Sequence, residues 1–228
     1  MLTVYEASVK NAKELSKQAK TIKRLLNQAL IKNSTSDIEA LTKTYALMYS
    51  AYAEVSFQKL INTPYGFSDD YIKQIQNCRN LEQKWEKCFE FALKNIAKEH
   101  NKGEIANKLK WFKEIMKKYI IAPSQIRNKI AHGQWCVCLN NDCTAINNDL
   151  THTLSNLDYV QIDRLFNIYK IFVQCVEDLI ESPQKAHYRD FYSRLSELDE
   201  YITKTENYSL ESKKEILLSS PKRCKEKF

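Results

Sequence analysis

The sequence predicts an all-α protein, a bundle of about six to seven helices into which one small β-hairpin is inserted. Glycine and proline occur only 3 and 4 times in 228 residues, and turn-rich β-sandwiches and barrels need both. Hydrophobic residues make up 43% of the chain and charged residues 28%, which are ordinary values for a protein that buries a core. Apolar residues recur at helical spacing along most of the chain.

The first half of the chain predicts four helices. The first is rich in lysine with spaced apolar positions, as in an amphipathic helix with one solvated face. The second follows a cluster of N-cap residues at 34–37, and a turn containing Pro64 and Gly66 separates it from the third. We expect these helices at residues 3–32, from Ile38 through Val55, from Ser68 to about residue 99, and from Glu104 to about Ile121.

The second half predicts a short fifth helix, the hairpin and two further helices. Pro123 suits the first turn of the fifth helix, which ends near Gly133. Alternating residues beyond Gly133 predict the β-hairpin at about 134–148. The last two helices are expected between Asn156 and Pro183 and across residues 188–202. The chain is therefore expected to form one helical domain over residues 1–205, followed by a basic, mobile tail over residues 206–228.

The formal net charge of +7 is unevenly distributed along the chain. Residues 102–130 carry eight basic and two acidic side chains, whereas residues 131–212 carry six basic and thirteen acidic ones. Lysine-rich helix faces can simply keep the protein soluble, or they can form a footprint for a polyanion by displacing counterions from phosphates. The basic half of one subunit can also attract the acidic half of another. Charge alone does not choose among these explanations.

The most informative segment reads Ile-Arg-Asn-Lys-Ile-Ala-His-Gly over residues 126–133. On a helix, Asn128 and His132 lie one turn apart on the same face, and Arg127 lies about 140° of rotation from His132. Arg127 and His132 can therefore flank a shared polar crevice. Gly133 permits a sharp exit, which leaves the imidazole at an accessible helix end.

This segment resembles the Arg-x4–6-His motif of the HEPN superfamily of helical-bundle proteins. The resemblance implies a metal-independent endoribonuclease of the kind found in toxin–antitoxin, abortive-infection and CRISPR-linked systems. It also implies a homodimer with the active site at the interface, and an antitoxin or regulatory partner. Members silenced by nucleotidylation carry Tyr two residues after the His, whereas this chain has Gln134, so that mode of control is not expected.

Cleavage of RNA by its own 2′-OH needs a base, a proton donor for the leaving oxygen, and positive charge near the phosphate. Histidine ordinarily titrates near neutral pH, so His132 can take either proton role. The planar guanidinium of Arg127 matches two phosphate oxygens, and Asn128 can orient the imidazole or bind phosphate. One histidine does not easily act as acid and base at once, which favours two Arg/His sets in a dimer. We therefore predict Arg127, Asn128 and His132 as catalytic residues that need no metal or cofactor.

Five lysines near the motif are predicted to guide the RNA backbone toward it. They are Lys110, Lys113, Lys117, Lys118 and Lys129.

Two other interpretations compete with this one. In the first, Arg127 pairs with a carboxylate and His132 caps its own helix, within a non-catalytic helical module that binds nucleic acid or a partner protein. In the second, zinc stabilises the hairpin, although the available spacing lacks the usual C-x2–4-C knuckle. The ligands would be Cys136, Cys138 and Cys143 with His132 or His152.

The chain shows no sign of a membrane segment or a secretory leader. No run approaches the roughly 20 apolar residues of a membrane span, and the first residues lack a basic stretch followed by an apolar one. The 7 cysteines are scattered and odd in number, as expected for reduced thiols. These observations predict a cytoplasmic protein.

Overall fold

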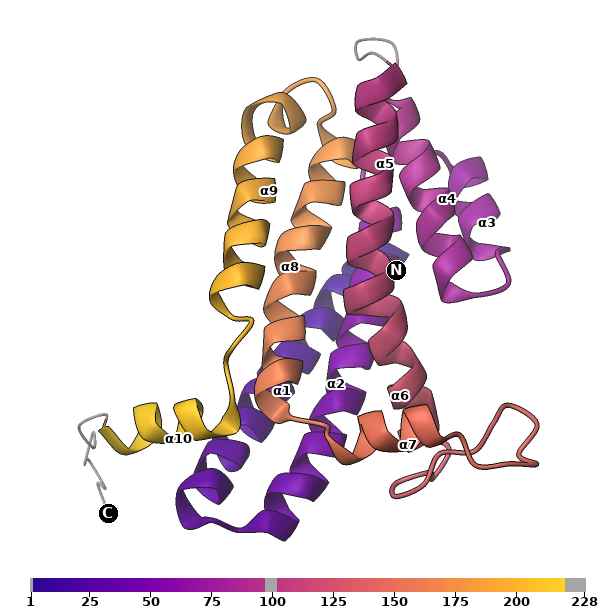
Figure 1. Ribbon diagram of the computed structural model, residues 1–228. Coiled ribbons are helices and arrows are strands. Elements are labelled where there is room, and N and C mark those ends of the chain that lie inside the picture. The colour runs from indigo at the N-terminus through magenta and orange to yellow at the C-terminus, as the bar shows by residue number, and fades with distance from the viewer. Residues whose placement is uncertain (1, 97–101, 220–228) are drawn as a thin grey trace.

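The structure is a computed structural model that describes residues 2–96 and 102–219. These residues are mainly helical and form no β-sheet, which confirms the predicted all-α class. Helix α8 lies beside α9 and α2 in the body of the molecule, and α3 and α4 flank the other side of α5 (Figure 1). The helices are α1 (Val4–Lys32), α2 (Thr35–Ile61), α3 (Asp69–Gln76), α4 (Leu81–Lys94), α5 (Lys102–Met116), α6 (Ala122–Ala131), α7 (Asn148–Ser155), α8 (Tyr159–Glu181), α9 (Ala186–Lys204) and α10 (Leu210–Ser219), with a π-helical turn at Lys117–Ile121 between α5 and α6.

Helices α1 and α2 form a long antiparallel pair (Figure 1). A capping box starts α1: the Thr3 hydroxyl accepts a hydrogen bond from the backbone N–H of Glu6, and the Glu6 carboxylate accepts one from the backbone N–H of Thr3. Asn33 ends the helix in the left-handed conformation, with φ of 56°. This end allows the chain to reverse directly into α2, so the sequence correctly predicts a boundary here.

Aromatic side chains form the centre of the core, where α4, α5 and α8 meet. The rings of Phe89 and Phe112 stack with their centroids 5.0 Å apart, and Phe172 lies against both of them. Trp85 is fully buried and its ring centroid lies 5.5 Å from that of Phe172. Because such side chains bury about 150–250 Å² each, this cluster supplies much of the apolar burial that holds the helices together.

The described chain has more helices than the six to seven expected, partly because the predicted third helix is divided. Helix α3 ends at Gln76, and a new helix, α4, begins at Leu81. Asn80 causes the second start, since its side chain accepts the backbone N–H of Gln83 at 2.9 Å. Residues 97–99, the predicted end of this helix, lie outside the described residues.

The predicted β-hairpin at about 134–148 is wrong. Only one isolated antiparallel bridge forms there, between Leu139 and Ile146. Two backbone hydrogen bonds flank this bridge: the N–H of Asn140 donates to the carbonyl of Ala145 at 2.8 Å, and that of Asn147 donates to the carbonyl of Cys138 at 2.7 Å. The pairing does not extend further, because the N–H of Cys138 donates to Thr151 Oγ1 at 3.0 Å. Residues 134–147 therefore form a loop, and helix α7 follows it.

Part of the expected mobile tail at 206–228 is a helix. Helix α10 packs against α1 and α8, and the backbone carbonyl of Tyr208 accepts a hydrogen bond from Gln161 Nε2 at 2.8 Å. Residues 220–228 lie outside the described residues. No helix within the described ranges is long and apolar enough to cross a membrane.

Candidate functional site

Helix α6 carries the predicted catalytic residues and is anchored by two isoleucines. Ile126 and Ile130 are buried, so the helix has a fixed rotational position against the core. This position leaves Arg127 half-buried and Asn128 and His132 exposed. The helical spacing of the motif therefore correctly predicts which face of α6 is buried and which face is polar.

Arg127 points toward α2 and lines a cavity of about 210 Å³ between α2, α4 and α6. One terminal guanidinium nitrogen, Nη2, lies 3.5 Å from Glu54 Oε2. The two side chains therefore form an ion pair, but this distance is long for a hydrogen bond. The Nε atom is buried and has no hydrogen-bond partner among the described residues. Arg79 and Lys84 line the same cavity.

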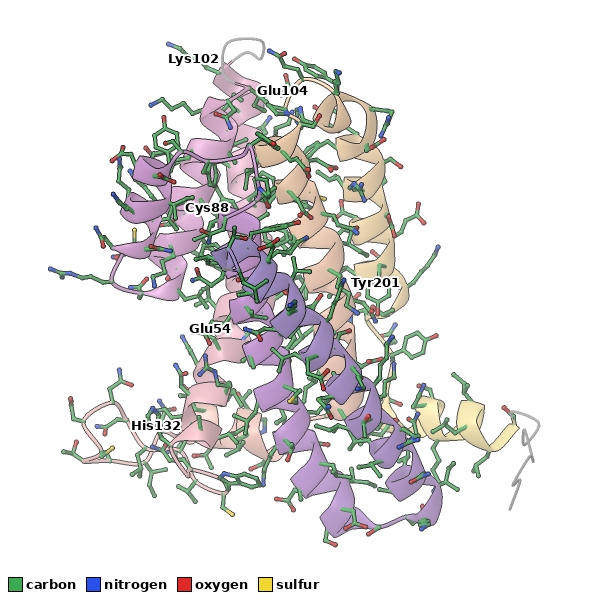
Figure 2. All side chains as sticks on the ribbon, turned by 180° about the vertical axis from the view of Figure 1, so that it is seen from behind. Glu54, Cys88, Lys102, Glu104, His132 and Tyr201 are labelled. Carbon is green, nitrogen blue, oxygen red and sulfur yellow. The ribbon has the colours of Figure 1, made fainter. Side chains whose placement is uncertain are left out.

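His132 is the C-cap residue of α6 and lies at the end of the helix (Figure 2). The chain leaves the helix through Gly133, whose φ is 80°. The N–H of Gln134 donates to the carbonyl of Lys129 at 2.9 Å and that of Gly133 donates to Ile130 at 3.0 Å, which is a Schellman motif. The His132 ring makes no hydrogen bond with another described residue, so both ring nitrogens remain available for a ligand.

His132 lines a second, larger cavity of about 710 Å³ between α6 and the 134–147 loop. Its lining is rich in side-chain amides and contains no carboxylate among the described residues. The amides belong to Gln125, Asn128, Gln134, Asn140, Asn141 and Asn147.

Arg127 and His132 do not share a cavity within one chain, so the predicted common crevice is not formed by a single copy. Figure 2 shows this separation: Glu54, the partner of Arg127, lies toward the middle of the molecule, whereas His132 lies near the loop. Asn128 lines both cavities and is therefore the link between them. The rotation of about 140° between the two side chains explains this result, because it directs them to opposite sides of α6.

Four of the five predicted RNA-binding lysines have partners in the protein. Lys113 Nζ lies 2.8 Å from Glu86 Oε1, and Lys117 Nζ lies 3.8 Å from Glu82 Oε1, so both face α4. Lys129 Nζ donates to the carbonyl of Leu139 at 2.7 Å, which holds the loop against α6.

Lys110 and Lys118 are exposed, as is Lys117. Lys110 Nζ lies 4.0 Å from Glu114 Oε1. Lys118 Nζ lies 5.2 Å from the Tyr119 ring and pairs with no described carboxylate. Of these five lysines, Lys118 alone is exposed without a described carboxylate or carbonyl partner.

Glu54, Arg79 and Lys84 are the residues near the site that sequence reasoning missed. They come from α2, from the turn before α4 and from the first turn of α4, and they lie near α6 only through tertiary packing. The N-cap signal of Asn80 is the one local feature that predicts a helix start beside Arg79.

The cysteines of the loop do not form a cluster. Cys138 is buried, whereas Cys136 and Cys143 are exposed. Burial raises the pKa of the Cys138 thiol, and the nearby charge of Lys129 opposes this rise. In residues 2–96 and 102–219, no group of three or more His, Cys, Asp or Glu side chains is arranged to hold a metal ion.

No family model, curated protein or solved structure matches this chain. The resemblance to the HEPN superfamily therefore depends on the motif of α6 and on the helical fold alone.

Proposed function

We propose that the protein is a metal-independent endoribonuclease of HEPN type that cleaves single-stranded or loop RNA by attack of the 2′-OH. One observation carries this proposal: His132 lies exposed and unpaired at the end of α6, one turn from Asn128, which connects its cavity to that of Arg127. An accessible imidazole one turn from a neutral amide is suited to proton transfer at a phosphodiester, and a guanidinium on the same helix is suited to neutralising its charge. A role as a cytoplasmic toxin or antiviral effector belongs to the same proposal.

The proposed roles follow from side-chain chemistry. His132 takes the 2′-OH proton, solvent water protonates the leaving 5′-oxygen, and Arg127 neutralises the charge that develops on the phosphorane oxygens. Asn128, which makes no hydrogen bond with another described side chain, donates to a phosphate oxygen between them.

A second copy of the chain completes this site in the proposal. Arg127 and His132 of one chain line separate cavities, so a composite site needs Arg127 of one subunit and His132 of the other. Exposed apolar side chains near His132 support an interface here, since Trp135, Val137 and Ile146 are all at least 39% exposed. A two-fold dimer would present two such composite sites.

The non-catalytic module is the second candidate, and a specific observation favours it. Arg127 lies 3.5 Å from the Glu54 carboxylate, as expected if the arginine is structural. In that case the basic surface binds RNA or an acidic partner without cleaving it.

Incubation of the protein with single-stranded RNA in excess EDTA separates the two candidates. The wild type should produce fragments ending in a 2′,3′-cyclic phosphate. His132→Ala and Arg127→Ala should each lower the cleavage rate by about 10²–10⁴ while the far-ultraviolet circular dichroism spectrum stays unchanged.

His152→Ala is the matched control, because His152 is exposed on α7 and lines neither cavity. This variant should cleave like the wild type. Intact RNA that stays bound to the wild-type protein would instead support the non-catalytic module, and full activity of His132→Ala would exclude the proposed chemistry.

A further inference from the structure

The cavity beside Arg127 is lined by three cations and one carboxylate. Arg79, Lys84 and Arg127 supply the positive charges, and Glu54 supplies the negative one. The Arg79 guanidinium and the Lys84 ammonium make no ion pair or hydrogen bond with any residue in the described ranges. Only the backbone N–H of Arg79 is engaged, with Gln83 Oε1 at 3.2 Å.

The cationic side chains of this cavity have few acceptors within the described residues. The buried Nε of Arg127 has none, and Glu54 lies only near the terminal nitrogen Nη2. Ser124 also lines the cavity, but its hydroxyl already donates to the carbonyl of Ile121 at 2.7 Å. Buried donors without acceptors are rare in proteins and call for a ligand or an ion. Three cations around one small space also repel one another, so an anion there relieves both costs.

The size and the residue types indicate which anion fits. Pockets for drug-sized ligands usually have volumes of about 300–1,000 Å³, and this cavity, at about 210 Å³, is smaller. It therefore suits a single charged group rather than a nucleobase with its sugar. Arginine forks and lysine ammonium groups are typical phosphate ligands, and a phosphate has enough acceptor oxygens to engage all three cations.

We propose that Arg79, Lys84 and Arg127 hold a phosphate of the RNA strand, next to the phosphate that is cleaved. This inference rests on the proposed endoribonuclease function. A guanidinium has five N–H donors, so Arg127 can contact the scissile phosphate and help to hold the adjacent one. Asn128 also lines this cavity and follows Arg127 directly on α6.

The test uses the double variant Arg79→Ala/Lys84→Ala and two ligands, inorganic phosphate and a 2′-O-methyl oligonucleotide that cannot be cleaved. The matched control is Lys73→Ala/Lys94→Ala, which removes the same charge from α3 and α4 at two exposed lysines outside this cavity. All proteins are studied in EDTA by thermal unfolding and by binding across a range of salt concentrations.

Inorganic phosphate should raise the melting temperature of the wild type and of the control, but not that of Arg79→Ala/Lys84→Ala. The slope of log affinity against log salt should become shallower by up to about 0.7 in the double variant, because these cations hold one phosphate and each phosphate contact contributes about 0.7 for a single strand. A double variant that behaves like the control in both measurements would overturn the proposal. Loss of the phosphate effect with an unchanged oligonucleotide slope would also overturn it, because the cavity would then take a free phosphate.

Cleavage of ordinary RNA is measured in parallel, so that the two proposals can fail separately. Cleavage by the wild type, together with an unchanged slope in the double variant, would refute the phosphate site and leave the ribonuclease function standing. Absence of cleavage together with a shallower slope would refute the ribonuclease function and leave a phosphate-binding cavity.

Discussion

Gly133 is the residue that determines how α6 ends. Its φ of 80° lies in the region that residues with a side chain rarely adopt, and the Schellman hydrogen bonds depend on this conformation. The sequence predicts this role, since a glycine directly after a helical motif is a typical helix stop.

Gly133→Ala should destabilise the protein by about 1–2 kcal/mol through backbone strain alone. A Cβ at this position meets no atom within 4 Å, so no steric clash contributes. Chemical denaturation measures the change, and Gly103→Ala in the first turn of α5 is the control that should show no loss. Equal stability of the Gly133→Ala variant and the wild type would contradict the strained helix end.

The cavity beside Arg127 shows the limit of prediction at the residue scale. The motif places Arg127, Asn128 and His132 on α6 correctly, because their positions follow from helical periodicity alone. Glu54 pairs with Arg127, and Arg79 lines the same cavity, only because distant segments pack together, and the spacing of these residues along the chain does not predict this.

At the scale of elements, α5 and α6 form one continuous rod with a π-helical turn, whereas the sequence predicts two separate helices. In an α-helix the carbonyl of Tyr119 would accept the N–H of residue 123, but that residue is a proline and has no N–H. The Tyr49 hydroxyl donates to this carbonyl at 2.6 Å instead. A donor from another helix therefore supports the turn, and local sequence reasoning does not reveal it.

Tyr49→Phe should destabilise the protein by about 1–2 kcal/mol, because it leaves the buried carbonyl of Tyr119 without its side-chain donor. Burial raises the pKa of Tyr49, so the phenol stays protonated and this contribution should not change between pH 6 and pH 9. Tyr65→Phe, at a fully exposed tyrosine, is the control. Equal stability of both variants would show that the hydrogen bond contributes nothing.

The lysines of the π-helical turn provide a test of the RNA path at the same scale. Lys117→Gln/Lys118→Gln should weaken binding to all RNA sequences similarly and flatten the salt slope by up to about 1.4. Glutamine is preferred to glutamate because an acid at position 117 would face Glu82. Lys10→Gln/Lys17→Gln on α1 removes the same charge, and an equal effect of both double variants would mean that these lysines only solvate the surface.

At the scale of the whole molecule, the sequence predicts the all-α class and the long helices of the core. The apolar positions of α8 repeat at helical spacing, and this helix contacts α2, α4, α9 and α10. The boundaries of the shorter helices are harder to predict. Asn80 and Asn147 start new helices inside predicted elements, because a single capping side chain outweighs the pattern around it.

The composite site requires a dimer in which Arg127 of one subunit acts with His132 of the other. Light scattering at micromolar concentration should therefore show twice the mass of one chain. A fully active monomer would contradict this arrangement, since a single chain separates the two side chains into different cavities.

Mixed dimers of Arg127→Ala and His132→Ala test this claim most directly. Each variant alone should be inactive, because every composite site lacks one of the two groups. In a mixed dimer one site keeps both groups, so an equimolar mixture after subunit exchange should regain about a quarter of the wild-type cleavage rate. A mixture that forms mixed dimers yet cleaves no faster than either variant alone would contradict the composite site.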